Sequence, residues 1–422
     1  MSNLRGSKMN DFIRPNYGHG CFADLPALIR HCLTGAAVDL PSAAQWGAYL
    51  RRYDAVVLVL VDAFGWRFFE RYADESPFLQ HFVRNGKVLR WTSQFPSTTT
   101  AHISCLNTGL PPGQSGLFEW QFYEPALDRV IEPLTFTFAG EKNPETMRFA
   151  GVDPTTIFPA PAYVQTLLGE GVQPAVYQPR EFSFTTYSSW MLRDTRPRGY
   201  RTVPAGLATL QHEVTESKSA GPRYFFFYAS AVDTIGHYDG PNSPQFAAEA
   251  ETMLFMLERA LLAPLCQKAR NTLLIFTADH GQVETDPQTT LYLNTNPAFS
   301  GFERFLRRDR QGALLPPGGS ARDPFLYIND GMVDEAQAFL ATRLAGKAEV
   351  VTTRSLVEEG YFGPPPFAPK FLARLGDLAV LPYAGETVWW YEKERFEQKF
   401  YGHHGGLTPQ EMEIPVGLVV LE

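Results

Sequence analysis

One sequence feature limits the possible folds of this chain more than any other. Several short runs of Val, Leu, Ile and aromatic residues end next to a polar side chain. The clearest are AVVLVLVD, which ends at Asp62, and TLLIFTADH, which ends at Asp279 and His280. A third run, RYFFFYASA, is followed by Asp233 and His237. Runs that are apolar on both faces are typical of buried parallel strands, and an open parallel sheet binds ligands at the carboxyl ends of its strands. The pattern predicts that these distant residues converge on one crevice.

Strand-like and helix-like patterns alternate through the parts of the chain that carry these residues. We expect strands near residues 53–61, 87–91, 223–229, 272–278, 377–383 and 415–421. We expect helices near 66–72, 99–107 and 245–268. The alternation predicts an α/β fold with a mostly parallel central sheet covered by helices on both faces.

Two long stretches do not show this alternation. Residues 120–215 contain scattered prolines and aromatic residues without a clear strand, and 285–375 contain clusters such as LLPPGGSARDP. We interpret both as cap insertions over the strand ends of a single domain that spans residues 1–422. Loops in such positions often decide which substrate an enzyme accepts.

Composition excludes some classes of function. The net charge of −8, from 37 basic and 45 acidic residues, argues against a protein that binds a nucleic-acid backbone. The N-terminus lacks the apolar region of a signal peptide, and the run 55–61 is too short to span a bilayer. The four cysteines form no CxxC pair. We therefore expect a cytoplasmic protein without a membrane partner, either a monomer or a homodimer, acting on a small phosphate ester.

The segment FPSTTTAH supplies a candidate nucleophile, Thr99. A threonine at the start of a helix is often an ordinary N-cap, and that reading remains open. The same position also favours an anion, because the first backbone N–H groups of a helix point toward it. A threonine hydroxyl becomes a nucleophile when a metal lowers its pKa. On chemistry alone, Thr98 and Thr100 are rival candidates.

The polar residues after the apolar runs are candidate metal ligands. Asp62 is either a ligand or the N-cap of the next helix. Asp233 and His237 are four residues apart and would face one cation if a turn joins them, which Gly236 permits.

The remaining candidate ligands strengthen this interpretation. Asp279 and His280 are costly to bury together unless they are coordinated or hydrogen-bonded. His403 and His404 lie between glycines, and either one is a candidate. Carboxylate oxygens with imidazole nitrogens suit zinc, with manganese or iron as alternatives. The inventory is sufficient for two divalent cations and one activated hydroxyl.

These residues lie in segments that resemble the type I phosphodiesterase/nucleotide pyrophosphatase branch of the alkaline phosphatase superfamily. The matching segments, in the family's order, are VLVLVDAFGW, FPSTTTAHISCLNTGLPPGQSG, ASAVDTIGHYDGP, IFTADHGQ and GHHGGLTPQEMEIPV. The resemblance implies two zinc-type ions and selects Thr99 as the nucleophile. It implies that one ion is held by Asp62, Thr99, Asp279 and His280, and that the other is held by Asp233, His237 and His404.

The resemblance also implies a two-step reaction. Thr99 would attack phosphorus and form a phosphothreonine, which water then hydrolyses, so that a phosphodiester or pyrophosphate bond is cleaved. Thr100 and Trp120 stand where nucleotide-specific members carry an aromatic residue and an asparagine. A phosphomonoesterase or phosphonate hydrolase that uses the same site is therefore the alternative, and a catalytically silent binding module is a rival of another class.

The aromatic residues around Trp120 allow two interpretations. Phe118, Trp120, Phe122 and Tyr123 either form an apolar wall for a substrate group or pack in the core below the insertion.

Overall fold

The centre of the protein is a seven-stranded sheet of order β2-β17-β9-β1-β8-β6-β7. The computed structural model describes residues 12–159, 163–195, 197–216 and 221–422. The strands of the sheet are β1 (Ala55–Val61), β2 (Lys87–Thr92), β6 (Gln173–Pro179), β7 (Arg198–Tyr200), β8 (Arg223–Ala229), β9 (Thr272–Thr277) and β17 (Glu413–Leu421). β1 pairs in parallel with β8 and β9, and β6 pairs in parallel with β8 and β7. β17 runs antiparallel to both β9 and β2. The mostly parallel α/β fold is thus confirmed.

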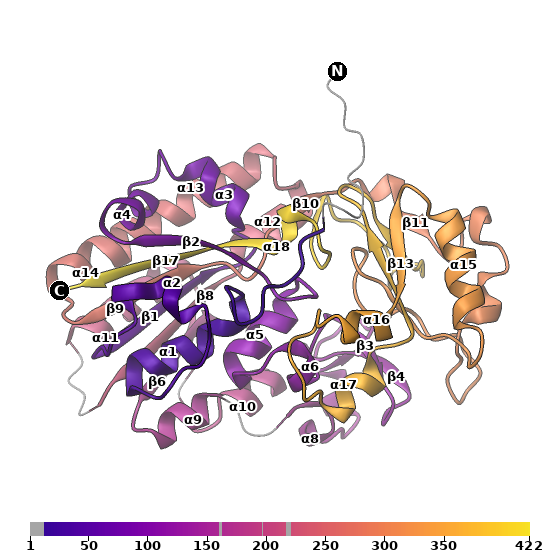
Figure 1. Ribbon diagram of the computed structural model, residues 1–422, viewed down its shortest axis with the longest axis horizontal. Helices are drawn as coiled ribbons and strands as arrows, with labels where there is room; N and C mark the ends of the chain where they lie inside the picture. The colour runs from indigo at the N-terminus through magenta and orange to yellow at the C-terminus, as the bar shows by residue number, and fades with distance from the viewer. Residues whose placement is uncertain (1–11, 160–162, 196, 217–220) are drawn as a thin grey trace.

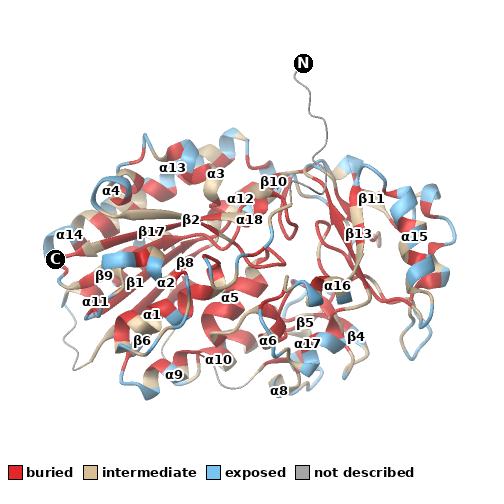
Figure 2. Cartoon of the chain, viewed as in Figure 1, coloured by how far each residue is buried: buried red, intermediate tan, exposed pale blue. Residues whose placement is uncertain are grey.

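Helices cover both faces of this sheet (Figure 1). In that view α3, α4 and α13 lie above the strands, and α1, α5 and α9 lie below them. The helices around the sheet are α1 (Leu25–Thr34), α3 (Trp66–Tyr72), α4 (Pro77–Asn85), α5 (Thr99–Thr108), α9 (Tyr163–Gly169), α11 (Val203–Glu216), α12 (Ala231–Asp239), α13 (Pro244–Met256) and α14 (Ala263–Lys268). All seven residues of β1 are buried, and Figure 2 shows the central strands buried along most of their length. Double coverage explains why these strands are apolar on both faces.

A second hydrophobic cluster forms beside the sheet. It includes Val130, Leu293, Phe305, Leu340 and Trp389. Its small sheets are β3-β4-β5 (Phe122–Glu124, Arg129–Glu132, Thr137–Phe138), β11-β15 (Leu291–Tyr292, Val388–Trp389) and β12-β14-β13 (Phe325–Leu326, Leu378–Pro382, Ala348–Thr352). The helices α15 (Val333–Arg343), α16 (Thr353–Glu358) and α17 (Pro369–Arg374) accompany these sheets, to the right of the central sheet in Figure 1. We call this part the cap unit.

The structure corrects the sequence interpretation at three places. β6 lies in residues 120–215, where no strand was expected, and it is a member of the central sheet. The expected strand at 377–383 forms as β14, but in an antiparallel sheet of the cap unit. The expected helix at 245–268 contains a π-helical segment, Leu257–Leu262, between α13 and α14. Pro264 follows that segment and has no N–H to donate to a regular helical ladder. The extent of the cap insertions and the single-domain assignment stay predictions.

Candidate active site

The ends of β1 and β9 bring four predicted residues into contact. Asp62 directly follows β1, and Asp279 and His280 follow its parallel neighbour β9. The Thr99 hydroxyl lies 3.4 Å from Asp62 Oδ2 and 3.3 Å from His280 Nε2. His280 Nε2 in turn lies 3.5 Å from Asp62 Oδ1 and 3.4 Å from Asp279 Oδ2. We call Asp62, Thr99, Asp279 and His280 the inner group.

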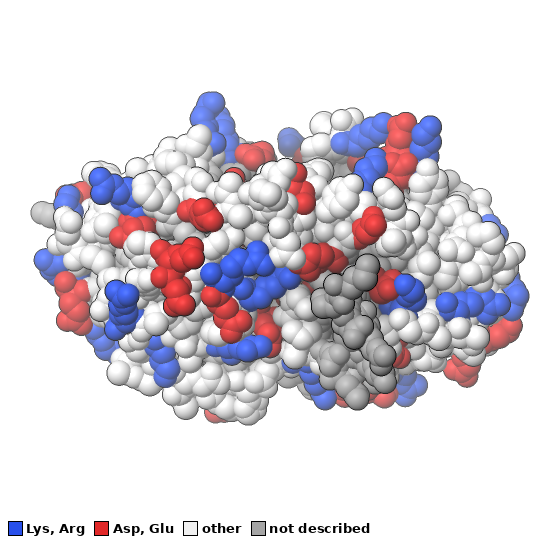
Figure 3. Space-filling model, turned by 90° about the horizontal axis from the view of Figure 1, so that it is seen from above, with Lys and Arg blue, Asp and Glu red and all other residues white. Residues whose placement is uncertain are grey.

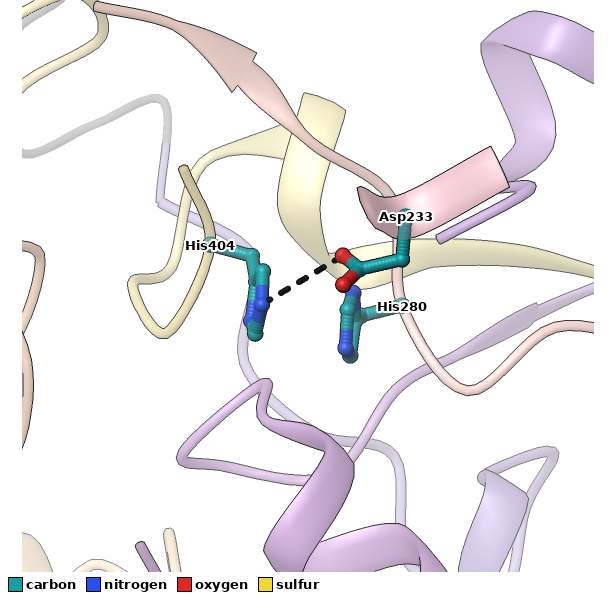
Figure 4. A group of neighbouring side chains, drawn as sticks. All are labelled: Asp233, His280 and His404. Atoms are coloured by element: carbon teal, nitrogen blue, oxygen red, sulfur yellow. Dashed lines mark ion pairs between the residues drawn. The ribbon is translucent and has the colours of Figure 1, made fainter. Parts of the chain in front are cut away.

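Three further predicted residues meet beside the inner group. His237 Nε2 and His404 Nε2 are 3.1 Å apart, and they lie 3.3 Å and 3.6 Å from Asp233 Oδ1. Figure 4 shows Asp233, His280 and His404 pointing toward one another from different segments, and the rings of His280 and His404 stack with centroids 3.7 Å apart. We call Asp233, His237 and His404 the outer group.

Asp233 and His237 share one face of a helix rather than a turn. Both lie in α12, where residues four apart are neighbours. Gly236 therefore does not serve as a turn residue. A Cβ at this position would lie 1.9 Å from Gln282 Oε1, so glycine is needed for the close approach of that side chain. The expected turn was wrong, and the expected pairing of the two side chains is present.

Backbone carbonyls fix the orientation of all three histidines. His237 Nδ1 donates to Gly402 O at 2.8 Å, and His280 Nδ1 donates to Gly281 O at 3.0 Å. His404 Nδ1 donates to Ser97 O at 2.9 Å. A carbonyl oxygen only accepts, so Nδ1 carries the proton and Nε2 presents its lone pair to the cluster.

The alternative ligand His403 is arranged differently. Its Nδ1 lies 2.9 Å from both the backbone nitrogen and the carbonyl oxygen of His404. The Nε2 of His404, 3.1 Å from His237 Nε2 and 3.6 Å from Asp233 Oδ1, places His404 in the outer group, and His403 lies beside it.

The electrostatics of the two groups match a cation site. Burial, reinforced by the charges of Asp279 and Asp233, raises the pKa of Asp62, and burial also raises the pKa of Asp233 and Asp279. Burial lowers the pKa of His280 and His404. Asp62 Oδ1 and Asp279 Oδ2 are buried without a hydrogen-bond partner. Three clustered carboxylates and three Nε2 lone pairs are a donor set that fits divalent metal ions.

The three threonines of the TTT segment have different positions. Thr98 is the N-cap of α5 and accepts from the Ala101 N–H at 3.5 Å, while Thr99 is the first helical residue. The Thr100 hydroxyl is buried without a hydrogen-bond partner. Of the three hydroxyls, that of Thr99 contacts Asp62 and His280. Asp62 is not an N-cap either, because Gly65 occupies the N-cap position of α3.

Two side chains that sequence reasoning missed hold the carboxylates in place. The Tyr228 hydroxyl donates to Asp62 Oδ2 at 2.5 Å, and Gln282 Nε2 donates to Asp233 Oδ1 at 2.7 Å. Tyr228 ends an aromatic strand and Gln282 follows the ADHG segment, so each lies near a predicted ligand. The sequence offered one weak signal for each: a single polar group, the Tyr228 hydroxyl or the Gln282 amide, in an otherwise apolar or glycine-rich segment.

Two cavities have Thr99 in their linings. The larger, of about 820 Å³, extends past Ile103, Arg180, Phe182, Phe184 and Tyr187. The smaller, of about 420 Å³, extends past His237, Trp389, Phe396, Phe400 and His404. Thr99, Asp233 and Trp120 line both.

The aromatic residues near Trp120 divide between the two expected roles. Trp120 is 42% exposed and lines both cavities, whereas Phe118 and Phe122 are fully buried in the core. His102 is also structural, because it is buried and its Nδ1 donates to Thr98 O at 2.6 Å.

The surface carries mixed charge. On the face shown in Figure 3, Lys and Arg side chains are interspersed with Asp and Glu. No helix within the described ranges is both long and apolar enough to cross a membrane.

Together, the mostly parallel sheet and the polar residues at its strand ends define an alkaline-phosphatase-like α/β fold. A family model described as type I phosphodiesterase/nucleotide pyrophosphatase matches residues 56–407, and the chain belongs to this family. It is accordingly a hydrolytic enzyme that acts on phosphate esters.

Solved structures agree on the fold. Murine ectonucleotide pyrophosphatase/phosphodiesterase 5, as an inactive threonine-to-alanine variant in complex with AMP, matches with a TM-score of 0.59 and 17% identity over 86% of this chain and 87% of that chain. The human protein of the same name matches with a TM-score of 0.58 and 16% identity over the same shares of the chains, 86% and 87%. A search of curated proteins finds no match.

Proposed function

We propose that the enzyme cleaves phosphodiester or pyrophosphate bonds through a phosphothreonine intermediate on Thr99. The proposed site binds two divalent cations, preferably zinc. The contact of the Thr99 hydroxyl with Asp62 and His280 carries this proposal. The inactive threonine-to-alanine variant of the murine relative, solved with AMP, supports it.

The ligands divide as the two groups suggest. Asp62, Thr99, Asp279 and His280 would hold one cation, and Asp233, His237 and His404 would hold the other. When bound, such cations activate a hydroxyl and neutralise the charge that develops on phosphoryl oxygens.

The chain's own atoms account for the covalent steps. The Thr99 hydroxyl donates to Asp62 Oδ2, which leaves its oxygen lone pairs free for the cavity. The Thr99 oxygen forms a bond to phosphorus as its proton passes to Asp62 Oδ2, while the bond to the leaving oxygen breaks and the leaving alkoxide takes a proton from water. Water then attacks the phosphothreonine, releases Thr99 and adds its oxygen to the phosphate product. The first backbone N–H groups of α5 have no acceptor within the helix and favour the negative charge of the phosphoryl group.

The two cavities favour a diester over a monoester. A diester carries two organic substituents on phosphorus, and two cavities share Thr99 in their linings. The second candidate, a phosphomonoesterase or phosphonate hydrolase, is supported by Thr100 and Trp120, which replace residues expected in nucleotide-specific members. A cytoplasmic location and a monomeric or homodimeric state remain predictions.

Metal analysis combined with a substrate screen tests the proposal. Zinc-loaded enzyme is assayed with bis(p-nitrophenyl) phosphate, p-nitrophenyl phosphate and p-nitrophenyl phenylphosphonate, with Thr99→Ala as the inactive control. We expect two metal equivalents and the fastest turnover with the diester. Preference for the monoester would favour the second candidate, and tight zinc binding without hydrolysis of any ester would support the silent binding module.

A further inference from the structure

Two buried carboxyl groups outside the two ligand groups form no ion pair with any Lys, Arg or His in the part of the chain that the structure describes. Glu119 and Asp323 are both 0% exposed, and the hydrogen bond from Gly319 N–H to Gln121 O at 2.7 Å joins the two segments that carry them. The charge of Glu119 raises the pKa of Asp323, so the two carboxyl groups lie close together. Glu119 lines the smaller cavity next to Trp120, and Asp323 lies in the loop before β12. Two buried carboxylates in contact repel each other unless a proton or a cation lies between them.

In each carboxyl group, one oxygen accepts hydrogen bonds from the described residues and the other accepts none. Glu119 Oε2 accepts from the backbone N–H of Trp120, and Asp323 Oδ1 accepts from the backbone N–H and hydroxyl of Ser320 at 3.0 and 2.7 Å. Among the described residues, none donates a hydrogen bond to Glu119 Oε1 or Asp323 Oδ2, and both atoms are buried. Such oxygens are costly in a folded protein, and a bound ion would satisfy both.

The nearest buried cation is fully committed elsewhere. Arg322 donates through Nε and Nη2 to Glu411 at 2.9 Å each, and its other N–H groups go to the carbonyl oxygens of Pro382, Tyr383 and Glu386. All five N–H groups of Arg322 are therefore used. Arg395, which also lines the cavity, binds Glu392 at 2.6 Å.

We propose that Glu119 and Asp323 form a third cation site, for a hard divalent ion such as Mg²⁺. Burial raises the pKa of Glu119 to about 8 and also that of Asp323, so protons on both groups are the competing way to remove the buried charge. A divalent ion balances both carboxylates without those protons. The donors are oxygens without any histidine, which suits Mg²⁺ rather than zinc, and Mg²⁺ is commonly held by one or two carboxylates with water completing its shell.

A cation bound at this site would stabilise the conformation of the loop that carries His404. The Ser320 hydroxyl, which binds Asp323, lies 3.2 Å from His404 O. At Gly405, with φ of +123°, a Cβ would lie 2.8 Å from Asp323 Oδ1. The Asp323 carboxyl group therefore packs directly against Gly405, the residue after His404 of the outer group.

Terbium luminescence on the zinc-loaded enzyme tests this site without a turnover assay. Tb³⁺ binds carboxylates, and Trp120 and Trp389 line the same cavity and can sensitise its emission. We expect a third metal equivalent that Mg²⁺ displaces, and at least about tenfold weaker Tb³⁺ binding in Glu119→Gln and Asp323→Asn. Glu132→Gln is the matched control and should bind as the wild type does, because Glu132 lines the cavity but accepts from Thr135 at 3.0 Å.

Thermal unfolding of the wild-type enzyme keeps the proposal testable if a variant does not fold. Mg²⁺ added to zinc-loaded wild type should raise its Tm, as expected for an ion that binds only the folded state. A wild type that binds two equivalents only and shows no Mg²⁺-dependent change in Tm would overturn the site and leave protons on both groups as the explanation. That result would not affect the proposed hydrolysis, which the ester assays test separately.

Discussion

The inner and outer groups hold the same kinds of ligand in different surroundings. The side chains of Asp62, Asp279 and His280 are at most 2% exposed and follow paired strands of the central sheet. Those of Asp233, His237 and His404 are 11–15% exposed and come from α12 and a loop after β16 (Gly402–His403). Strand pairing fixes the inner group, whereas the outer group depends on the packing of a loop against a helix. We therefore expect the inner cation to be retained more tightly than the outer one.

Removing the hydroxyl that belongs to the inner group should have the largest effect. Thr99→Ala should lower turnover of bis(p-nitrophenyl) phosphate at least about a thousandfold, because the covalent nucleophile is lost. Thr98→Ala is the control, since Thr98 caps α5 and should cost stability, on the order of 1 kcal/mol, rather than chemistry. Near-normal activity of Thr99→Ala would remove it from its proposed role.

Changing one ligand from each group tests the comparison directly. Asp279→Asn should bind the inner cation poorly, and His237→Ala should retain about one equivalent of zinc after dialysis, because the inner group is intact. Mass spectrometry of the dialysed proteins gives the stoichiometry. If His237→Ala lost both metals as readily as Asp279→Asn, the two groups would behave as one unit.

The hydrogen bonds that hold the carboxylates should have smaller, selective effects. Tyr228→Phe should weaken metal binding at the inner group about 10–100-fold, since Asp62 Oδ2 loses its donor at 2.5 Å. Gln282→Leu should act on the outer group instead, through Asp233. Zinc titrations that resolve a tight and a weak site measure this, and equal changes at both sites in either variant would contradict the assignment.

The smallest effect is expected at Gly236. In Gly236→Ala the new Cβ would displace the end of the Gln282 side chain, which is flexible, so the protein should fold with a weaker Gln282–Asp233 hydrogen bond. We expect a change in outer-site zinc affinity below that of Gln282→Leu. A larger change would mean that α12 itself moves.

The sequence predicted the central strands well because they are covered on both faces. β1, β8 and β9 are long uninterrupted apolar runs, and the polar residues after them are the ones that meet. β6 escaped prediction because its sequence, QPAVYQP, contains two prolines and two glutamines around three apolar residues. Its place in the sheet depends on pairing with β8, which no local pattern reveals.

By itself, the sequence determined the parallel sheet and the choice of residue types at its strand ends, since burial on both faces requires apolar strands and leaves polar side chains only where they stop. Tertiary structure decided what those side chains do. The cap of α5 falls on Thr98, which leaves the Thr99 hydroxyl to the inner group. The Nδ1 contact with Ser97 O orients the His404 ring, and its Nε2 contacts His237 and Asp233. These choices depend on distances between segments hundreds of residues apart, and only the packed chain sets those distances.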